Sequence, residues 1–263
     1  GDVVRAAEDY DAARRMAESL DDTKSLIVAL NDVGRVALKR GDVPQAISSH
    51  GRAVMLAQQL GAPELVIESL TALATAEHRA GSLQEAERRY EEALELAQQR
   101  SDRSTEATLR NNLGLVREAR GEVDQAAQLF RQAMALNQAL GNLEAEASNH
   151  VNLGMLAEAR RDYEAAEREY ERALELDKTA EQRMEIAADL QRLGRIAERR
   201  GFPDRGLVYS ERAYRSYLAQ GAFAQARSAL SQAVGCAKKM ERAGDLARLE
   251  MELNRLTASQ SAR

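Results

Sequence analysis

Residues 109–148 read LRNNLGLVREARGEVDQAAQLFRQAMALNQALGNLEAEAS, and the same arrangement of small and aromatic residues recurs every forty residues along the chain. Its fixed points, termed the template positions, are Gly114, Gly121, Ala126, Phe130 and Ala133. Forty residues later they are Gly154, Arg161, Ala166, Tyr170 and Ala173, and forty earlier Ala74, Gly81, Ala86, Tyr90 and Ala93. A fixed period of this size is typical of repeat proteins, so the sequence predicts a solenoid of stacked repeats.

The composition favours helices over strands. Of the 263 residues, 44% are hydrophobic and 30% are charged, whereas only 4% are aromatic and Trp is absent. Because strands are enriched in aromatic and β-branched residues, we predict an all-α chain. The formal net charge of -5 is spread over the sequence and provides no concentrated basic surface. We therefore expect neither nucleic acid nor a membrane as a partner.

The cysteine count and hydropathy indicate the cellular setting. Cys236 is the single cysteine, so the chain has no internal disulfide and no CxxC-type metal site. No apolar run approaches the ~18 residues of a membrane-spanning helix, and no secretory segment precedes the repeats. Lysine is scarce beside arginine, a bias associated with GC-rich genomes. We expect a soluble, cytoplasmic, bacterial protein without a metal or other cofactor.

Helices are expected to alternate with short turns. Pro44, Pro63 and Pro203 all fall at predicted helix starts, where the missing N–H of proline costs nothing. The expected helices cover residues 3–20, 23–40, 44–60, 63–80, 83–100, 103–120, 123–140, 143–160, 163–177, 181–200, 203–220, 222–243 and 245–257, with residues 257–263 frayed.

We assign the whole sequence, residues 1–263, to a single array. Residues 1–20 are read as the second helix of a truncated repeat, cut from a longer protein, whose uncovered face favours self-association. Residues 222–257 are read as a degenerate repeat and a capping helix, in which a leucine stripe lies three residues out of register. The full repeats cover residues 23–60, 63–100, 103–140, 143–178 and 180–220.

Four glycines lie inside predicted first helices, where glycine costs about 1 kcal/mol relative to alanine. They are Gly34, Gly114, Gly154 and Gly194. We expect that close approach of the paired helices requires them, and that Phe130 or Tyr170 fills the space between consecutive repeats.

The spacing resembles the tetratricopeptide repeat. From Gly114 it runs seven residues to a second glycine, five to an alanine, four to an aromatic and three to a second alanine. Units of that family usually have about thirty-four residues. The forty-residue unit resembles the longer variant found in kinesin light chains, in spindle-orientation scaffolds with GoLoco motifs and in bacterial Rap-type peptide sensors. HEAT and armadillo arrays share the longer period but do not require this spacing.

The resemblance implies a right-handed α-α superhelix whose first helices line a concave groove that binds peptides or helices of other proteins. The family's groove positions fall here on Asn31, Arg35, Lys39, Arg79, Asn111, Asn112, Leu115, Glu118, Asn152, Met155, Arg195 and Arg199. The groove is expected to be basic at both ends and mixed in the middle. The full Lys/Asn/Lys/Arg carboxylate clamp of chaperone-binding members is absent, so a chaperone-tail adaptor is not predicted.

Individual groove residues suggest how a ligand is held. An asparagine amide can bond both the N–H and the C=O of a peptide backbone, so Asn111, Asn112 and Asn152 are the candidates for that role. The alternative is that they only solvate a helix face. Arg35 and Lys39, with Arg79, are candidates for binding a carboxylate.

No residue pattern indicates catalysis. His50 and His150 occupy large-residue slots and are expected to pack in the core, His78 has no partner at metal-ligand spacing, and Cys236 is expected to be buried. We predict a non-catalytic protein-interaction scaffold. The alternative is a regulatory sensor region of a larger signalling protein or transcription regulator.

Overall fold

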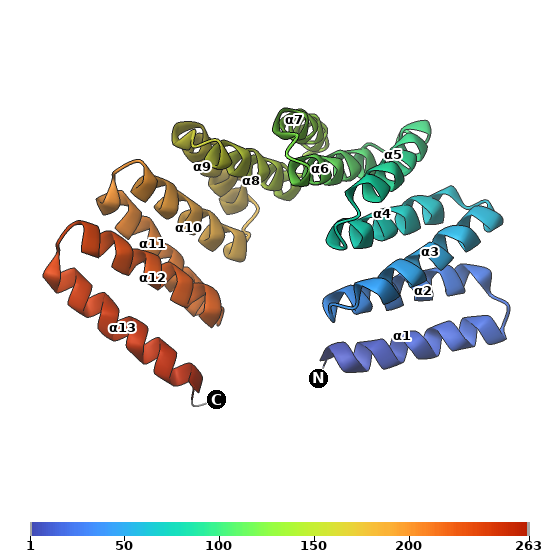
Figure 1. Ribbon diagram of the computed structural model, residues 1–263, viewed down its shortest axis with the longest axis horizontal. Helices are drawn as coiled ribbons and strands as arrows, with labels where there is room; N and C mark the ends of the chain where they lie inside the picture. Colours follow the sequence, from blue (N-terminus) through green and yellow to red (C-terminus); the bar gives the residue numbers. More distant parts are fainter. Residues whose placement is uncertain (1, 262–263) are drawn as a thin grey trace. The chain divides into compact units, whose positions relative to one another are not determined.

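The computed structural model describes residues 2–261, with the side chains of residues 8–257. All regular elements in this range are α-helices (Figure 1). They are α1 (Asp2–Ser19), α2 (Thr23–Lys39), α3 (Val43–Leu60), α4 (Pro63–Arg79), α5 (Leu83–Gln99), α6 (Arg103–Ala119), α7 (Val123–Leu140), α8 (Leu143–Ala159), α9 (Tyr163–Thr179), α10 (Arg183–Arg199), α11 (Pro203–Ala219), α12 (Phe223–Lys239) and α13 (Ala243–Ser261).

The turns between helices recur every twenty residues, and each contains a residue with positive φ. At Gly41, with φ of 79°, the amide donates to Leu38 O, and the next amide, that of Asp42, donates to Ala37 O at 2.9 Å. These bonds satisfy the last carbonyls of α2. Asp21, Ser101, Arg161, Glu181 and Glu241 adopt the same left-handed conformation without being glycine. The turn is therefore imposed by the packing of the helix pair as well as by glycine.

Helix starts are fixed by side-chain caps or by proline. The carboxylates of Asp42, Asp102 and Asp162 each accept a hydrogen bond from the backbone N–H three residues on. This bond satisfies one of the free amides of a first helical turn. Pro63 and Pro203 begin α4 and α11, as expected for residues without an N–H.

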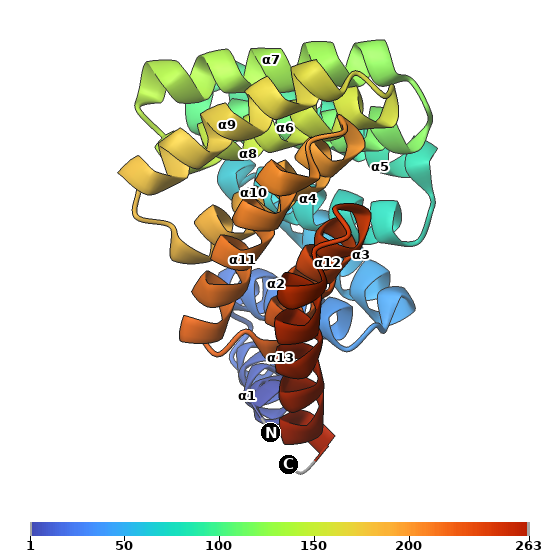
Figure 2. The same cartoon turned by 90° about the vertical axis from the view of Figure 1, so that its left-hand side faces the viewer.

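The helices form two compact units, Gly1–Leu136 (unit 1) and Asn137–Arg263 (unit 2), with α7 contributing to both. Within unit 1, α2 packs on α3 and α4 on α5, and within unit 2, α8 packs on α9 and α10 on α11 (Figures 1 and 2). The all-α class, built from helix pairs, is confirmed in each unit. The assignment of the whole sequence to one array stays a prediction.

The glycines inside first helices receive the large side chain of the paired second helix. A Cβ at Gly114 would lie 2.5 Å from the Phe130 ring, and a Cβ at Gly154 would lie 2.6 Å from the Tyr170 ring. His50 occupies the same place against Gly34. Close helix approach is thus confirmed as the reason for these glycines. Each ring therefore packs against the first helix of its own repeat, and the expectation that it also fills the space between consecutive repeats stays a prediction.

The C-terminal region differs from the sequence-based expectation. Helix α12 ends at Lys239 instead of continuing to 243, and α13 begins at Ala243, in phase with the twenty-residue step. It continues to Ser261, where fraying was expected from Thr257. Leu249 and Leu256 are its buried leucines and join the core of unit 2. Both views show α13 lying along α12 (Figures 1 and 2).

Candidate functional site

The first helix of each pair carries the residues predicted to bind a ligand. These helices are α2, α4 and α6 in unit 1, and α8 and α10 in unit 2. The predicted residues of unit 1 are Asn31, Arg35, Lys39, Arg79, Asn111, Asn112, Leu115 and Glu118, and those of unit 2 are Asn152, Met155, Arg195 and Arg199.

Unit 1 contains a pocket of about 450 Å³ on this face, termed the α4 pocket. Ile67 and Ala72 of α4 provide apolar surface, and Thr71 and Thr105 provide hydroxyls. The other lining residues are Asn31, Arg35, Glu64, Glu68, Arg100 and Asp102.

Unit 2 contains a pocket of about 370 Å³ between α8 and α10, termed the α8 pocket. Val151 is its apolar residue, and the C-terminal part of α9 closes it through Asp177. The other lining residues are Glu144, Ser148, Asn152, Gln182, Glu185 and Arg192.

The two pockets occupy the same place in the repeat. Six of their lining positions are related by a shift of eighty residues, which is two repeats. The same hollow therefore forms where successive first helices meet, whatever the side chains. The related pairs are Glu64 and Glu144, Glu68 and Ser148, Thr71 and Val151, Ala72 and Asn152, Asp102 and Gln182, and Thr105 and Glu185.

The charges of the α4 pocket are paired. Arg100 Nη2 lies 2.5 Å from Glu64 Oε1. Arg35 forms an ion pair with Asp32 on its own helix, and its Nη1 lies 3.8 Å from Glu68 Oε1. The third carboxylate, Asp102, caps α6 by accepting from Thr105 N and Oγ1. A ligand in this pocket would therefore meet apolar surface beside arginines that already have carboxylate partners.

Carboxylates outnumber arginines in the α8 pocket. Arg192 is its one arginine, and the guanidinium donates at 2.7 Å to Asp189, a fully buried carboxyl. Burial raises the pKa of Asp177, and the nearby Glu185 and Glu144 carboxylates raise it further. Burial, together with the neighbouring Asp177, raises the pKa of Asp189 to about 7. Such perturbed carboxyls can mark a functional site, although buried structural networks produce them too.

Asn31, predicted as a groove position, lines the α4 pocket, but its amide is used inside the protein. Asn31 is 1% exposed, and its Nδ2 donates to Ser69 Oγ at 2.9 Å. Its Oδ1 lies 3.0 Å from His50 Nδ1. The sequence could not reveal this, because His50 replaces the usual aromatic residue and needs a polar partner in the core.

Arg195 does not form a free basic end of a groove. Its Nε and Nη2 donate to the two carboxylate oxygens of Glu158 at 2.8 and 2.9 Å. Tyr170 donates to the same carboxylate at 3.1 Å. This bidentate pair links α8 to α10 and neutralises the charge of Arg195.

The other predicted cations are exposed. Lys39 lies at the end of α2, Arg79 at the end of α4 and Arg199 at the end of α10. Arg79 Nη1 also donates to Leu38 O at 3.5 Å, so it approaches the end of the preceding first helix.

The mixed middle of the predicted groove is divided between the units. In unit 1, Asn111, Asn112, Leu115 and Glu118 of α6 are all half-buried, and burial raises the pKa of Glu118. In unit 2, Asn152 lines the α8 pocket. Met155 is 45% exposed on α8. Ligand binding by these residues stays a prediction.

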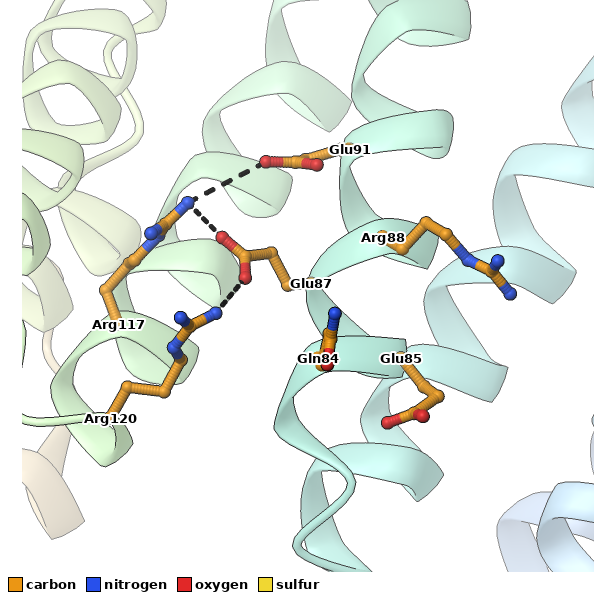
Figure 3. Close-up of a pocket in the computed structure, with 7 residues that line it drawn as sticks. All are labelled: Gln84, Glu85, Glu87, Arg88, Glu91, Arg117 and Arg120. Atoms are coloured by element: carbon orange, nitrogen blue, oxygen red, sulfur yellow. Dashed lines mark hydrogen bonds and ion pairs between the residues drawn. The ribbon is translucent and has the colours of Figure 1, made fainter.

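A third pocket, between α5 and the C-terminal part of α6, is lined by charged and polar side chains (Figure 3). Arg117 of α6 and Arg120, which caps the end of that helix, both reach the buried Glu87 carboxylate on α5, and Arg117 also faces Glu91. Because its strongest charges are already paired, this pocket links two repeats instead of offering an open anion site.

Unit 2 contains the corresponding link eighty residues later. Glu167 is buried and accepts from Arg205 Nη2 at 2.9 Å and from Arg200. The sequence contains one signal that could have revealed these links. Glu87 and Glu167 lie eighty residues apart, and each is followed thirty-three residues later by an arginine, Arg120 or Arg200.

The remaining chemically reactive residues lie in the core. His50 and His150 are buried, as expected, and so is Cys236. Burial raises the pKa of the Cys236 thiol to about 11 and lowers the pKa of His78. Among the described residues, no group of three or more His, Cys, Asp and Glu side chains is arranged to hold a metal ion.

A family model described as tetratricopeptide repeat matches residues 25–99 and 104–179. The chain belongs to the tetratricopeptide repeat family. No curated protein sequence matches it. None of the helices described for this tetratricopeptide chain is long and apolar enough to cross a bilayer.

Solved structures with the same tetratricopeptide architecture include three of differing context. BtubC (BKLC) from P. vanneervenii has a TM-score of 0.73 and 22% identity, covering 84% of this chain and 93% of BtubC. A signal transduction ATPase with a tetratricopeptide repeat sensor, from Pyrococcus horikoshii, has a TM-score of 0.80 and 16% identity, covering 95% of this chain and 38% of the ATPase. A Rap protein complexed with Competence and Sporulation Factor has a TM-score of 0.68 and 15% identity, covering 99% of this chain and 72% of the Rap protein. At these identities the likeness concerns the fold.

Proposed function

We propose that this protein is a non-catalytic interaction module that holds an extended peptide of a partner protein along its first helices. The observation that carries the proposal is the recurrence of a pocket at the same repeat position in each unit, the α4 pocket and the α8 pocket. Membership of the tetratricopeptide repeat family supports a role in protein interaction. Recurrent pockets suit a peptide, which presents side chains at regular intervals.

The side chains around the pockets support a division of roles. Ile67 and Ala72 provide an apolar wall in the α4 pocket, which suits an uncharged peptide side chain. Asn111 and Asn112, on the next first helix, are the proposed partners of the peptide backbone in unit 1. Asn152, which lines the α8 pocket, is proposed for the same role in unit 2.

The test begins with selection of peptides from a random displayed library on the immobilised protein. Affinities of the selected peptides are then measured for pocket-filling variants. Ala72→Gln and Ser148→Gln place a longer side chain in the α4 and α8 pockets, respectively. We expect Ala72→Gln to lower the affinity of peptides that occupy the α4 pocket at least about tenfold, because the peptide side chain loses its site. Ser148→Gln should do the same for peptides that occupy the α8 pocket.

A matched control separates the pockets from the rest of the surface. Gln128 is an exposed amide on the second helix α7, so Gln128→Ala should leave affinity within about twofold. The triple variant Asn111→Ala, Asn112→Ala and Asn152→Ala tests the backbone contacts. Unchanged affinity in all pocket and asparagine variants would remove the first-helix face from the proposed function.

A regulatory sensor region within a larger signalling protein is the alternative function. The structure of an ATPase with a tetratricopeptide repeat sensor supports it only at the level of fold, since the two chains share 16% identity. The full-length reading frame decides between the two, because a stand-alone module requires no adjoining effector domain.

Self-association through α1 is a further part of the proposal. Met16, in the last turn of this helix, is 66% exposed, and Leu20, directly after it, is 70% exposed. Light scattering over a hundredfold range of concentration should show a rise in mass, and a constant monomer mass would contradict it. A cytoplasmic location and a bacterial source stay predictions.

A further inference from the structure

A groove of about 560 Å³ lies on the opposite, second-helix side of unit 1, between α3 and α5. Leu73 of α4, together with Val54 and Met55 of α3, provides apolar surface. Arg52 and Arg89 provide its charges. No aspartate or glutamate lines the groove. We term it the α3/α5 groove.

Gly51 is the residue that opens this groove. It lies in the middle of α3, where glycine costs about 1 kcal/mol relative to alanine. Close packing does not explain it, because a Cβ at Gly51 would meet no atom within 4 Å. At the equivalent positions of later repeats the chain has long charged residues instead, namely Glu91, Arg131, Glu171 and Glu211.

Arg89 lines the groove, and its guanidinium forms only long ion pairs with Glu92 and Glu77. Its Nε is buried and has no hydrogen-bond partner among the described residues. The nearest carboxylates, Glu92 and Glu77, lie 3.8 and 4.0 Å from the guanidinium, beyond hydrogen-bond distance. By contrast, Arg52 lies 2.9 Å from Glu18 of α1. A half-buried guanidinium with unsatisfied donors favours an incoming carboxylate.

We propose that the α3/α5 groove docks an acidic amphipathic segment of a partner protein, with an apolar side chain against Leu73 and Met55 and a neighbouring carboxylate on Arg89. Charge complementarity selects this occupant, because Arg89 has no hydrogen-bonded carboxylate, whereas Arg52 is already bound by Glu18, and no carboxylate belongs to the lining itself. The surface is separate from the first-helix face, so the inference does not depend on the proposed peptide site.

Two probes of defined chemistry test the proposal. The first is hexanoate, which carries only an apolar chain and a carboxylate, with hexylamine as its charge-reversed control. The second is a labelled synthetic helix with leucine and glutamate four residues apart on one face, compared with the same helix carrying lysine for glutamate. Binding is followed by NMR at the Gly51 amide and the Arg89 Nε–H, and by fluorescence polarisation of the labelled helix.

Substitutions at Gly51 provide a matched pair of variants. Gly51→Glu introduces the residue found at three later repeats and should lower affinity for the acidic helix at least about tenfold, by filling the groove and engaging Arg89. Gly51→Ala should keep affinity within about twofold. Both should fold, because neither side chain begins against another atom. Arg89→Gln should also lower affinity at least about tenfold.

The expected result is that hexanoate, and not hexylamine, shifts both NMR signals, and that the acidic helix binds more tightly than its lysine version. If hexanoate binds but the two helices do not differ, the site takes a small carboxylate and docking of a protein segment is overturned. Absence of any shift with hexanoate, or equal binding of the acidic helix by the Gly51→Glu and Gly51→Ala variants, also overturns the proposal.

Discussion

The α4 pocket of unit 1 and the α8 pocket of unit 2 lie at the same repeat position, yet the residues around them differ in kind. Beside the α8 pocket, the buried carboxyls Asp177 and Asp189 interact, whereas unit 1 has Ala97 and Leu109 at these two positions. The backbone produces the hollow in both units. The chemistry of each pocket is set by residues outside the template positions. At these residues two copies of one repeat can differ in function while keeping the same fold.

The two units also differ in which buried group titrates. In unit 1, burial lowers the pKa of His50 to about 4, with the nearby Arg35 acting in the same direction. In unit 2, burial raises the pKa of Asp189 to about 7 against the opposing effect of Arg192. In each case burial disfavours the charged form of the group. Because one is a base and the other an acid, their effects on stability have opposite dependence on pH.

The largest expected effect follows from removing the ring that packs on the first-helix glycine. Phe130→Ala in unit 1 and Tyr170→Ala in unit 2 should each lower the free energy of unfolding by about 3–5 kcal/mol, because each leaves a cavity in a fully buried position. Hydrogen exchange measured separately for α4 and α10 should show the loss mainly in the unit that carries the substitution. Equal loss of protection in both units would mean that they unfold together.

The next effect is the opposite response of the units to pH. Folded unit 2 retains a proton on Asp189 between about pH 4 and 7 that the unfolded chain has lost, so its stability falls as pH rises through this window. The unfolded chain binds a proton on His50 below about pH 6.5 that folded unit 1 excludes down to about pH 4, so unit 1 loses stability as pH falls. Each change is on the order of a few kcal/mol.

Hydrogen exchange of the same two helices at pH 5 and pH 7, corrected for intrinsic rates, measures these changes. The double variant Asp177→Ala and Asp189→Leu gives unit 2 the residues of unit 1, and should abolish its loss of stability at rising pH. Replacing interacting buried polar groups by apolar ones is often neutral or stabilising, so the variant should fold. A pH dependence that survives in the double variant would assign it to another group.

A smaller effect is expected from the glutamates that link repeats. Glu87→Gln and Glu167→Gln each remove the buried carboxylate that two arginines share. Arg117 and Arg120 keep Glu122 as a partner, and Arg200 keeps Glu164. Because these arginines are partly exposed, the expected loss is about 2 kcal/mol rather than the full cost of breaking a buried pair. Chemical denaturation in low and high salt measures it, with Gln128→Ala as the neutral control. A loss in only one of the two variants would show that the links are not equivalent.

The smallest expected loss of stability comes from giving unit 2 the same aromatic residue as unit 1. Tyr170→Phe keeps the ring of Phe130 and removes the hydroxyl that donates to Glu158. The loss should be about 1 kcal/mol, because Arg195 still binds both oxygens of that carboxylate. Thermal unfolding followed by circular dichroism measures it. A loss as large as that of Tyr170→Ala would mean that the hydroxyl, and not the ring, carries the contact.

Much of the fold follows from local sequence. Pro44, Pro63 and Pro203 lie in the first helical turns predicted from them, and a positive-φ residue recurs at the turn positions expected from the period. The helix ends near 243 and 257 were predicted less well, because α12 and α13 depart from the template residues and only their packing fixes the boundary.

The candidate site was predicted only in part. Helical periodicity located the first-helix face but could not show that Asn31 turns inward to His50, or that Arg195 is bound by Glu158. Ser148 and Glu185, which line the α8 pocket, carry no pattern that distinguishes them from solvated helix positions. Such partners come from other helices, dozens of residues away for the Arg195 pair, and local periodicity contains no information about them.

The sequence alone determined the repeat, the helical class and the family, because these depend on the spacing of glycine, alanine and aromatic residues along one chain. The tertiary structure decided which polar residues are used internally, where the pockets open, and why Gly51 differs from Gly34. The physical reason is that spacing acts through local backbone geometry. Pairing of charges and filling of volume depend instead on side chains that only folding brings together.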